Sequence, residues 1–528
     1  MKKYILPTLT VLAVALGVVI GVSLSQKANA QRIIYQDGSW HFEQSKIDRL
    51  LQLMETAYVD SLNIDSITDE VMTEMVERLD PHSAYIPKED LEMVNSELAG
   101  SFSGIGVQFT IQQDTVRIVA VIAGGPSEGV GVLAGDKLIT VDDSLFVGKK
   151  INNEKVMRTL RGEKGTQVKL GVLRAGTPDM LYFTITRGDI PVNSVDAKFI
   201  IEPKVESQKS KDKIGFVRAN KFGETTYREF ISALAELRAQ GATRFIIDLR
   251  ENSGGYMDQA IRMANEFLRR GDMIVYSEGK AYPRFEAKAD GSGRFKDTPI
   301  VVLIDDFSAS ASEIFAGAMQ DNDRAQIIGR RSFGKGLVQQ QLPFDDGSAI
   351  RLTVARYYTP SGRCIQKPST LGEQGDYEKE LVERWEHGEF YSADSIHFAD
   401  TTTYRTIAGR IVHGGGGSMP DIFVGLDTTL NTPWYNKCVN LAYTYQFAYQ
   451  YTDKNRKELS KFKDWQSLEQ HLLKQNILRE FVAFAKAKGV EPNEAEIAKS
   501  KPLMIRLLNA YIVRDMLGDE GFFPLFER

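Results

Sequence analysis

Three polar residues that could carry out nucleophilic catalysis lie within about 30 positions of one another: Ser310, Lys335 and Gln339. Ser310 is the middle serine of the block FSASASE, which follows an apolar run and opens a predicted helix. The free N–H groups of a helix N-terminus stabilise negative charge, which suits a nucleophile whose attack builds an oxyanion. The pattern Ser310-x-x-Glu313 also fits a capping box without chemistry, and this motif alone favours that alternative.

Lys335 makes a catalytic interpretation stronger. It lies between Gly334 and Gly336 on a loop before the predicted strand 337–342, and glycines allow a backbone or a substrate to approach closely. A buried lysine with a lowered pKa can take the proton of a serine hydroxyl, as in Ser-Lys variants of the catalytic triad. Gln339 shares a strand face with Lys335 and could orient its amine. The alternative is an ordinary solvated loop lysine.

Two glycine-rich turns are candidate anion-binding sites. Gly254 and Gly255 follow an apolar run and precede a predicted helix, so their bare amides could form half of an oxyanion hole. The loop containing Gly104, Ile105, Gly106 and Val107 leads into a strand, where its amides could hold the terminal carboxylate of a peptide that adds as an extra strand. A plain tight turn is the alternative in each case.

The hydrophobic pattern changes several times along the chain. Residues 41–98 show apolar residues at helical spacing, and residues 99–187 contain five short β runs with one helix at about 152–160. From residue 214 onwards, apolar strands alternate with helices, which predicts a sheet covered on both faces. Residues 368–403 are polar and predict a surface excursion. The last hundred residues are rich in helix signals, with Pro492 and Pro502 as interruptions.

Length and composition restrict the class of protein. The chain has 528 residues, which predicts about three or four domains, and its 42% hydrophobic and 26% charged residues are ordinary for globular proteins. A net charge of −5 argues against a nucleic-acid partner, because such affinity comes mostly from basic patches. Two cysteines, Cys364 and Cys438, exclude a zinc cluster of CxxC type; they could form one disulfide, but two free thiols are favoured.

The N-terminus predicts export. Lys2 and Lys3 precede an apolar stretch, and Ala28-Asn29-Ala30 fits a signal-peptidase cleavage pattern. The stretch is also long enough to span a bilayer at residues 5–24, so a cleaved signal and an uncleaved anchor both fit. Either would place the body of the chain in the periplasm or another extracytoplasmic space, because the two lysines remain inside.

Taken together, these motifs resemble the carboxyl-terminal processing peptidases, or tail-specific proteases, which are exported serine proteases with an inserted PDZ domain. The loop at 104–107 resembles their PDZ carboxylate-binding loop, and FSASASE resembles their nucleophile block, with Ser310 as the nucleophile. Lys335 follows at the family's Ser-to-Lys spacing, and Gln339 matches the supporting glutamine. The segment LDPHS at 79–83 and the block YYTPSG at 357–362 also resemble family segments. The resemblance covers about residues 40–367 and 414–427.

This resemblance implies a multidomain α+β fold. The expected parts are a signal peptide or anchor, an N-terminal helical region, an inserted PDZ β domain, an α/β protease core with a mixed sheet, an excursion that returns to the core, and a helix-rich extension: residues 1–30, 31–98, 99–187, 188–367, 368–431 and 432–528. The Ala311 amide joins Gly254 and Gly255 as an expected oxyanion donor. The expected partners are proteins or peptides with free C-termini, and an adaptor or a second copy of the chain; no metal, nucleotide or other cofactor is expected.

Four other interpretations were compared with this one. Residues 329–335 fit the P-loop pattern GxxxxGK, but Gly336 stands where Mg²⁺ needs Ser or Thr, and a strand rather than a helix is predicted to follow. The run His413-Gly-Gly-Gly416 is found in esterases, but the chain has no G-x-S-x-G elbow. It also has no HExxH pair for a zinc protease, and His82 is expected to be a hydrogen-bonded core residue. A catalytically inactive PDZ scaffold or adaptor remains the alternative function.

Overall fold

The computed structural model describes residues 32–527, apart from 37–38, 44, 97, 113, 123, 134, 175, 203–212, 370–373 and 398–401. The chain divides into two compact units, with the boundary between Glu77 and Arg78. The first contains the antiparallel hairpin of β1 (Arg32–Gln36) and β2 (Ser39–Glu43), then α2 (Lys46–Ala57) and α3 (Ile64–Glu77). The helices were expected from their apolar spacing; the hairpin was not. The predicted signal or anchor at 5–24 lies outside the described residues. Among the helices within the described ranges, none is long and apolar enough to span a membrane.

The second unit begins with β3 (Ala84–Ile86) and α4 (Lys88–Ser96), and a small β domain with a short helix follows. Its sheet has the order β10-β9-β7-β6-β5, so β5 is an edge strand whose outer side pairs with no described strand. The five predicted β runs and the predicted helix are all present. The elements are β4 (Ser101–Gly104), β5 (Val107–Gln112), β6 (Thr115–Val121), α5 (Pro126–Val130), β7 (Lys137–Val141), β8 (Ser144–Leu145), α6 (Asn153–Leu160), β9 (Gln167–Leu173), β10 (Leu181–Thr186) and β11 (Gly188–Pro191).

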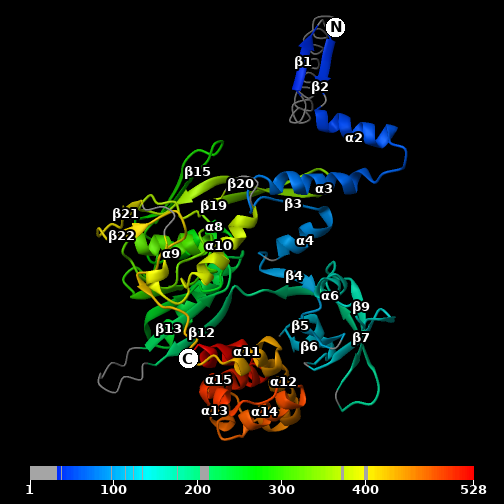
Figure 1. Cartoon of the computed structure of the whole chain (residues 1–528), viewed down its shortest axis with the longest axis vertical. Helices are drawn as coiled ribbons and strands as arrows, with labels where there is room; N and C mark the ends of the chain where they lie inside the picture. The colour runs from blue at the N-terminus through cyan, green and yellow to red at the C-terminus, as the bar shows by residue number, and fades with distance from the viewer. Residues whose placement is uncertain are drawn as a thin grey trace, which may run out of the picture. The chain divides into compact units, whose positions relative to one another are not determined.

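A six-stranded mixed sheet forms the centre of the second unit, with the order β12-β13-β14-β17-β18-β23; β12 and β13 are labelled in Figure 1. Only β12 runs antiparallel to its neighbour; the other pairs are parallel. Together with the helices and the small β domain, this sheet confirms the predicted α+β fold class. The strands are β12 (Val195–Ile201), β13 (Lys213–Ala219), β14 (Ala242–Asp248), β17 (Ile300–Ile304), β18 (Gln326–Gly329) and β23 (Ile422–Phe423).

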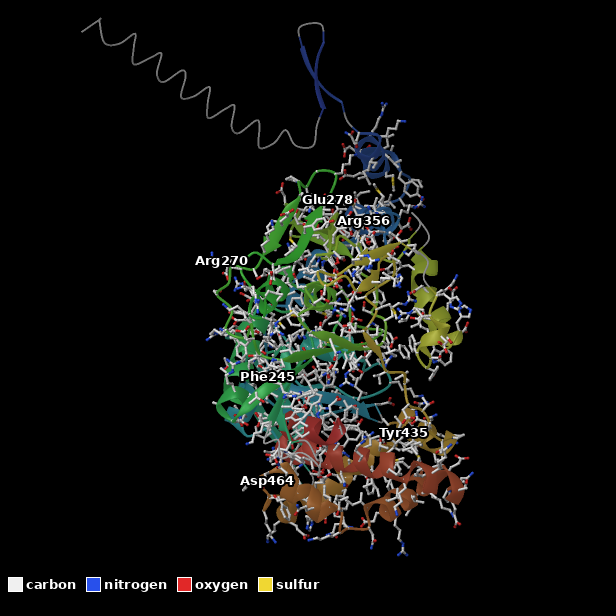
Figure 2. All side chains as sticks on the ribbon, turned by 90° about the vertical axis from the view of Figure 1, so that its left-hand side faces the viewer. Phe245, Arg270, Glu278, Arg356, Tyr435 and Asp464 are labelled. Carbon is white, nitrogen blue, oxygen red and sulfur yellow. The ribbon has the colours of Figure 1, made fainter. Side chains whose placement is uncertain are left out.

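One face of this sheet is covered by α7 (Thr226–Ala239), α8 (Met257–Asn265) and α9 (Ala311–Asp321). Phe245 of β14, which is labelled in Figure 2, belongs to this cluster, whereas its neighbour Ile246 packs against a second cluster on the opposite face. Successive strand residues point to opposite faces, so both must be apolar when both faces are buried. This is the physical reason for the unbroken apolar runs in the sequence.

The second face is covered by the C-terminal extension, to which the sequence assigned no role. Side chains of the extension, among them Trp434 and Phe481, share a buried cluster with Phe216 of β13, and Tyr435, labelled in Figure 2, packs at its edge. The prediction of helices is confirmed, but Pro502 lies inside a helix and does not end one. The helices are α11 (Pro433–Asn440), α12 (Tyr443–Leu459), α13 (Trp465–Leu472), α14 (Ile477–Ala487), α15 (Glu494–Leu517) and α16 (Asp519–Phe526).

A second sheet, of order β16-β15-β20-β19 with β3 paired to β20, carries residues on the other side of the site. The excursion contains α10, a 3-10 turn at 393–395 and a short hairpin. The prediction of a surface excursion is wrong in part, because Arg384 and Glu389 are buried and hydrogen-bonded to each other. Cys364 and Cys438 are both free thiols. The elements are β15 (Met273–Glu278), β16 (Phe285–Lys288), β19 (Leu337–Pro343), β20 (Ala349–Tyr358), α10 (Gln374–Glu386), β21 (Thr403–Arg405) and β22 (Ile411–His413).

Candidate active site

Three neighbouring parallel strands bring the predicted site residues to one edge of the sheet. The strands β14, β17 and β18 lie side by side, and the loop after each one carries part of the predicted site. Gly254 and Gly255 follow β14, Ser310 follows β17, and Lys335 follows β18. The carboxyl edge of a parallel sheet is the usual place for ligands in such folds. Residues that are up to 81 positions apart in the chain, from Gly254 to Lys335, therefore share one region.

Of the three serines in FSASASE, two have structural hydrogen bonds. The Ser308 hydroxyl donates to the Leu249 carbonyl at 2.7 Å, and the Ser312 hydroxyl donates to the Asn252 carbonyl at 2.8 Å. Both side chains are fully buried, and they join the loop after β17 to the loop after β14. Ser310 is partly exposed. These contacts leave the middle serine as the one whose hydroxyl is available to a substrate.

The backbone of Ser310 is held in an unusual conformation. Its φ of 53° is in the left-handed region, where a residue with a Cβ atom is strained by roughly 1–2 kcal/mol. Both of its backbone polar groups are fixed: the N–H donates to Glu313 Oε2 at 2.9 Å, and the carbonyl accepts from the Tyr357 hydroxyl at 2.9 Å. The predicted link between Ser310 and Glu313 is therefore present as a contact from the Ser310 N–H to the glutamate.

Glu313 is a fully buried carboxylate at the centre of the site. Oε2 accepts from the N–H groups of Ser310 and Lys335, both at 2.9 Å. Oε1 accepts from the Gly334 N–H at 2.8 Å and from the Ser332 hydroxyl. Burial raises the pKa of Glu313, and these hydrogen bonds oppose that shift. One side chain thus fixes both the loop that carries the serine and the loop that carries the lysine.

Tyr357 of β20 joins the same two loops from the other side. Its hydroxyl lies 2.9 Å from the Ser310 carbonyl and 2.7 Å from the Lys335 carbonyl. The side chain is almost completely buried, and burial raises its pKa well above the ordinary value, so it stays a neutral donor. The sequence pointed to Tyr357 only through its resemblance to a family segment, because no local pattern indicates this contact.

Lys335 and Gln339 meet as predicted, although not within one regular strand, because β19 begins at Leu337 and a β-bulge lies between Val338 and Gln339. The Lys335 Nζ donates to Gln339 Oε1 at 3.0 Å, and the Gln339 amide nitrogen donates in turn to the His82 carbonyl. Burial, followed by the charge of Arg351, lowers the pKa of Lys335. Among the described residues, the Lys335 amine donates its hydrogen bond to Gln339, and it makes none to the Ser310 hydroxyl. The site therefore holds a lysine amine of lowered pKa that donates to Gln339.

His82 is hydrogen-bonded, as expected from the sequence, but it is half-buried and does not lie in the core. Its Nε2 lies 2.8 Å from the Tyr377 hydroxyl, and burial together with the charge of Lys335 lowers its pKa to about 4. Asp80 fixes the turn by accepting from the N–H groups of His82 and Ser83, both at 2.9 Å. The segment is thereby positioned so that its carbonyl can hold Gln339.

The two glycines after β14 differ in what they offer. The Gly254 N–H donates to Asn252 Oδ1 at 2.9 Å. The expectation that it binds an oxyanion is therefore wrong, because this N–H is already occupied. The Gly255 N–H has no partner within the described part of the chain. Gly254 instead allows close packing, because a Cβ there would lie 2.7 Å from the Ser310 Cβ and 2.9 Å from the Ala311 nitrogen. The N–H groups of Gly255 and Ala311 are therefore the better pair of candidate donors.

The loop at 104–107 has its carbonyl groups occupied. The Ile105 carbonyl accepts from the Ser127 N–H at 3.0 Å and from its hydroxyl at 2.6 Å, and the Gly106 carbonyl accepts from the Ile122 N–H at 3.0 Å. Gly106 has a φ of 77°, which favours glycine. Within the described ranges, the N–H groups of Ile105 and Gly106 have no hydrogen-bond partner. Val107 begins the edge strand β5. The loop can therefore present two amides beside an open strand edge.

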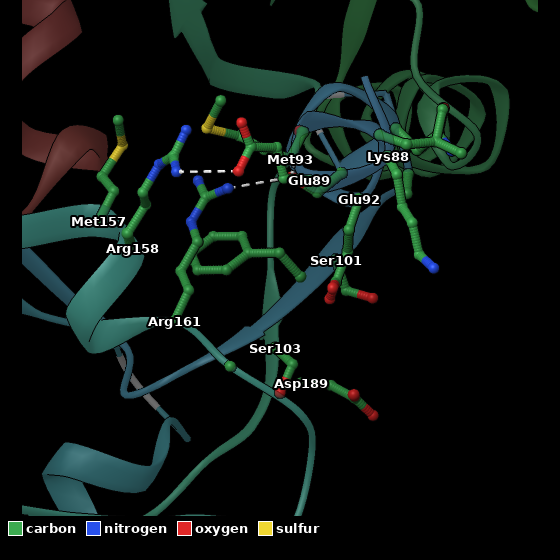
Figure 3. A pocket seen from close by; sticks show the side chains of 16 residues that line it. Lys88, Glu89, Glu92, Met93, Ser101, Ser103, Met157, Arg158, Arg161 and Asp189 are labelled. Carbon is green, nitrogen blue, oxygen red and sulfur yellow. Dashed lines mark hydrogen bonds and ion pairs between the residues drawn. The ribbon is translucent and has the colours of Figure 1, made fainter. Parts of the chain in front are cut away.

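A cavity of about 700 Å³ lies next to this loop and away from Ser310 (Figure 3). It is lined on one side by Phe102 and Ser103, directly before Gly104, and on the other by Met157 of α6. The Arg161 guanidinium lies 4.2 Å from the centre of the Phe102 ring. The cavity thus combines apolar surface with charges of both signs, because Glu89, Glu92 and Asp189 line it together with Lys88, Arg158 and Arg161.

Family comparisons agree with this arrangement. Residues 213–378 match the model of peptidase family S41, residues 103–185 match the PDZ domain model, and residues 434–518 match a family of unknown function (DUF8443). The carboxy-terminal processing protease CtpA of Bacillus subtilis is 34% identical over 339 residues, which cover 63% of this chain and 70% of that protein. The carboxy-terminal-processing protease of Bartonella bacilliformis is 36% identical over 325 residues, covering 60% and 71%.

A solved structure, of the photosystem II D1 C-terminal processing protease, is 29% identical and covers 62% of this chain and 86% of that one, with a TM-score of 0.37. The fold and the sequence relatives together define a serine-type protease with a PDZ domain. The chain belongs to peptidase family S41, the carboxy-terminal processing proteases.

The role of Glu313 can be tested by the substitution Glu313→Gln. The new amide would place a donor among the N–H groups of Ser310, Lys335 and Gly334, so we expect a loss of about 2–4 kcal/mol in the free energy of unfolding and at least a tenfold loss of peptidase activity. Urea unfolding and peptide hydrolysis measure the two effects. The control Glu236→Gln, in an exposed pair with Lys198, should cost less than about 1 kcal/mol. Unchanged stability and activity in Glu313→Gln would contradict the assigned role.

Proposed function

We propose that this protein is an exported serine endopeptidase that recognises the C-termini of proteins and hydrolyses their peptide bonds through an acyl-enzyme on Ser310. The observation that carries the proposal is that the backbone N–H groups of Ser310 and Lys335 both bind one buried carboxylate, Glu313, which joins the loop of a partly exposed serine to the loop of a lysine of lowered pKa. A buried neutral amine next to a serine hydroxyl is the arrangement that Ser-Lys catalysis needs.

The proposed reaction begins when the neutral Lys335 amine takes the proton of the Ser310 hydroxyl. The oxygen attacks the scissile carbonyl, and the N–H groups of Gly255 and Ala311 bind the oxyanion. The Lys335 ammonium then gives its proton to the departing amine, which leaves an ester on Ser310. A water molecule, deprotonated by the same amine, attacks the ester and releases the new C-terminus. Gln339 accepts a hydrogen bond from the lysine and keeps its side chain oriented.

Tail recognition is assigned to the PDZ domain. The amides of Ile105 and Gly106 can bind a carboxylate, and an extended peptide can pair with the open edge of β5. The cavity beside Phe102 and Met157 lies next to this loop and offers apolar surface for the last side chains of such a peptide.

Export is proposed from the N-terminal sequence. The lysines at positions 2 and 3, the apolar run 5–24 and the Ala28-Asn29-Ala30 pattern support placement of the body outside the cytoplasm, whether soluble or anchored.

A second candidate function, an inactive PDZ scaffold or adaptor, is favoured by the hydrogen bond of the Lys335 amine to Gln339 instead of Ser310. Activity measurements separate the two.

The dyad is tested by Ser310→Ala, Lys335→Ala and Lys335→Arg. Each should reduce hydrolysis of an unfolded protein such as casein by at least about a thousandfold without unfolding the chain, because nucleophile and base act as a unit and a guanidinium does not deprotonate. Fluorescent casein release and circular dichroism measure activity and fold. Full activity in Lys335→Ala would exclude this lysine as the base. A wild type no more active than Ser310→Ala would favour the scaffold.

The pH dependence should report the lysine. Because the neutral amine is the base, kcat/KM should rise by about tenfold per pH unit until pH passes the lowered pKa of Lys335, and then level off. His82, with a pKa of about 4, is already neutral in this range and should contribute no inflection. The pH profile of His82→Ala should therefore keep its shape, whatever its height. A profile that became flat in His82→Ala would indicate a histidine base.

Tail recognition predicts a preference for a free terminal carboxylate. A substrate ending in apolar residues and a carboxylate should be cleaved faster than the same chain with an amidated end, because losing a set of charge-assisted hydrogen bonds costs roughly 1.5–3 kcal/mol, or about ten- to hundredfold in binding. Competition between the two substrates measures the ratio. Deletion of residues 101–187 with a short linker should abolish the preference. Equal cleavage by the intact protein would show that the loop at 104–107 does not bind the carboxylate.

A further inference from the structure

The loop that carries Gly255 is held at its start by two arginines. Arg250 donates through Nε to Asp248 Oδ1 at 2.9 Å and through Nη2 to Asp248 Oδ2 at 2.7 Å. Arg218 of β13 pairs with Glu251 at 2.6 Å. Glu251 has a φ of 61°, so this part of the loop adopts a conformation that side chains disfavour and that its contacts must maintain.

Arg218 also contacts α16, at the end of the extension, and Arg250 contacts Glu527, the residue that caps this helix. The Arg250 Nη2 pairs with the Glu527 carboxylate, which lies 277 positions further along the chain. The Arg218 guanidinium carbon lies 5.0 Å from the centre of the Phe523 ring. Two adjacent residues of the loop are therefore connected to the same end of the extension. Arg250 is connected directly, and Glu251 is connected through Arg218.

The helix itself is firmly seated on the sheet. Phe522, Phe523 and Leu525 are buried in the cluster that covers the second face, together with Ala197 of β12 and Phe216 of β13. Glu527 and Asp248 both pair with Arg250: the Glu527 side chain is only 15% exposed and that of Asp248 is completely buried, while the arginine itself is 35% exposed. An ion pair in such surroundings is screened much less than one in open solvent, so it can hold its partner in one position.

The distance along the chain from these contacts to the reacting atoms is short. Asn252 follows Glu251, and its side chain accepts from the Gly254 N–H while donating to the Ala219 carbonyl at 2.8 Å. The Asn252 carbonyl accepts from the Ala309 N–H at 3.0 Å, directly before Ser310. A displacement of Arg250 and Glu251 would thus be passed to the Gly255 amide and to the serine loop together.

We propose that α16 is a positioning element of the oxyanion loop, and that Glu527, acting through Arg250, is a positioning residue for the Gly255 amide. This inference rests on the proposed peptidase function and gives the extension a part in the rate of the reaction. An oxyanion donor acts only when it is placed within a fraction of an ångström of the developing charge, so a modest shift of the loop lowers kcat and leaves substrate binding almost unchanged.

The test compares Glu527→Ala with the matched control Glu520→Ala, which removes the same charge from an exposed position of the same helix. We expect kcat of Glu527→Ala to fall roughly tenfold with KM within about twofold, and the affinity for a peptidyl boronate, which forms a tetrahedral adduct on the serine, to fall by a similar factor. The control should match the wild type. In an Arg250→Gln background, Glu527→Ala should cause little further loss, because the effect passes through that arginine.

Several results would overturn the inference. Wild-type kcat and boronate affinity in Glu527→Ala would do so, as would a lower melting temperature with unchanged kcat, since α16 would then serve stability alone. An increase in KM with intact kcat would assign the helix to substrate binding instead. Ser310→Ala in the same assay separates the two proposals: if the wild type hydrolyses no more peptide than Ser310→Ala, the peptidase function fails and this inference fails with it.

Discussion

The site depends on one buried carboxylate, Glu313, that is held by hydrogen-bond donors. Glu313 accepts from three backbone N–H groups and one hydroxyl, which together offset the cost of removing a charge from water. A salt bridge in the same place would need room for a long cationic side chain. Backbone donors need none, so the loops after β17 and β18 can approach each other closely enough to bring Ser310 and Lys335 into one site.

This arrangement also explains why Ser310 can adopt a strained conformation. In an ordinary helix cap, the serine hydroxyl would satisfy a free N–H group of the first turn. Here Glu313 binds the Ser310 N–H, Tyr357 binds the Ser310 carbonyl, and the hydroxyls of Ser308 and Ser312 join the adjoining loops. Because its φ is positive, the backbone of Ser310 differs in conformation from that of Ser308 and Ser312. Ser310 is also partly exposed, whereas Ser308 and Ser312 are fully buried.

The sequence predicted those parts of the site that depend on local spacing. Periodicity and glycine position account for the strand before Ser310, the helix after it and the strands of the PDZ domain. Contacts between distant segments were not predictable in this way. Tyr357, the His82 carbonyl and the Asn252 side chain act through tertiary contacts that leave no local pattern, and Asn252 is the reason why Gly254 cannot serve as an oxyanion donor. The β1–β2 hairpin and the buried charges of the excursion were missed, because a polar composition does not show which charges find partners.

The two-sided burial of the central sheet connects these observations. The loops after β14, β17 and β18 leave from one edge, and their geometry is only as rigid as the strands that precede them. Helices α7, α8 and α9 pack on one face, while the extension packs on the other, so Phe245 and Ile246 are held from opposite sides. A sheet with one bare apolar face would expose a large hydrophobic surface and could bend toward it. The residues that the sequence could only describe as helical therefore complete the core on which the catalytic geometry is built, and the α16 contacts at Arg250 and Arg218 extend that support to the edge where the chemistry takes place.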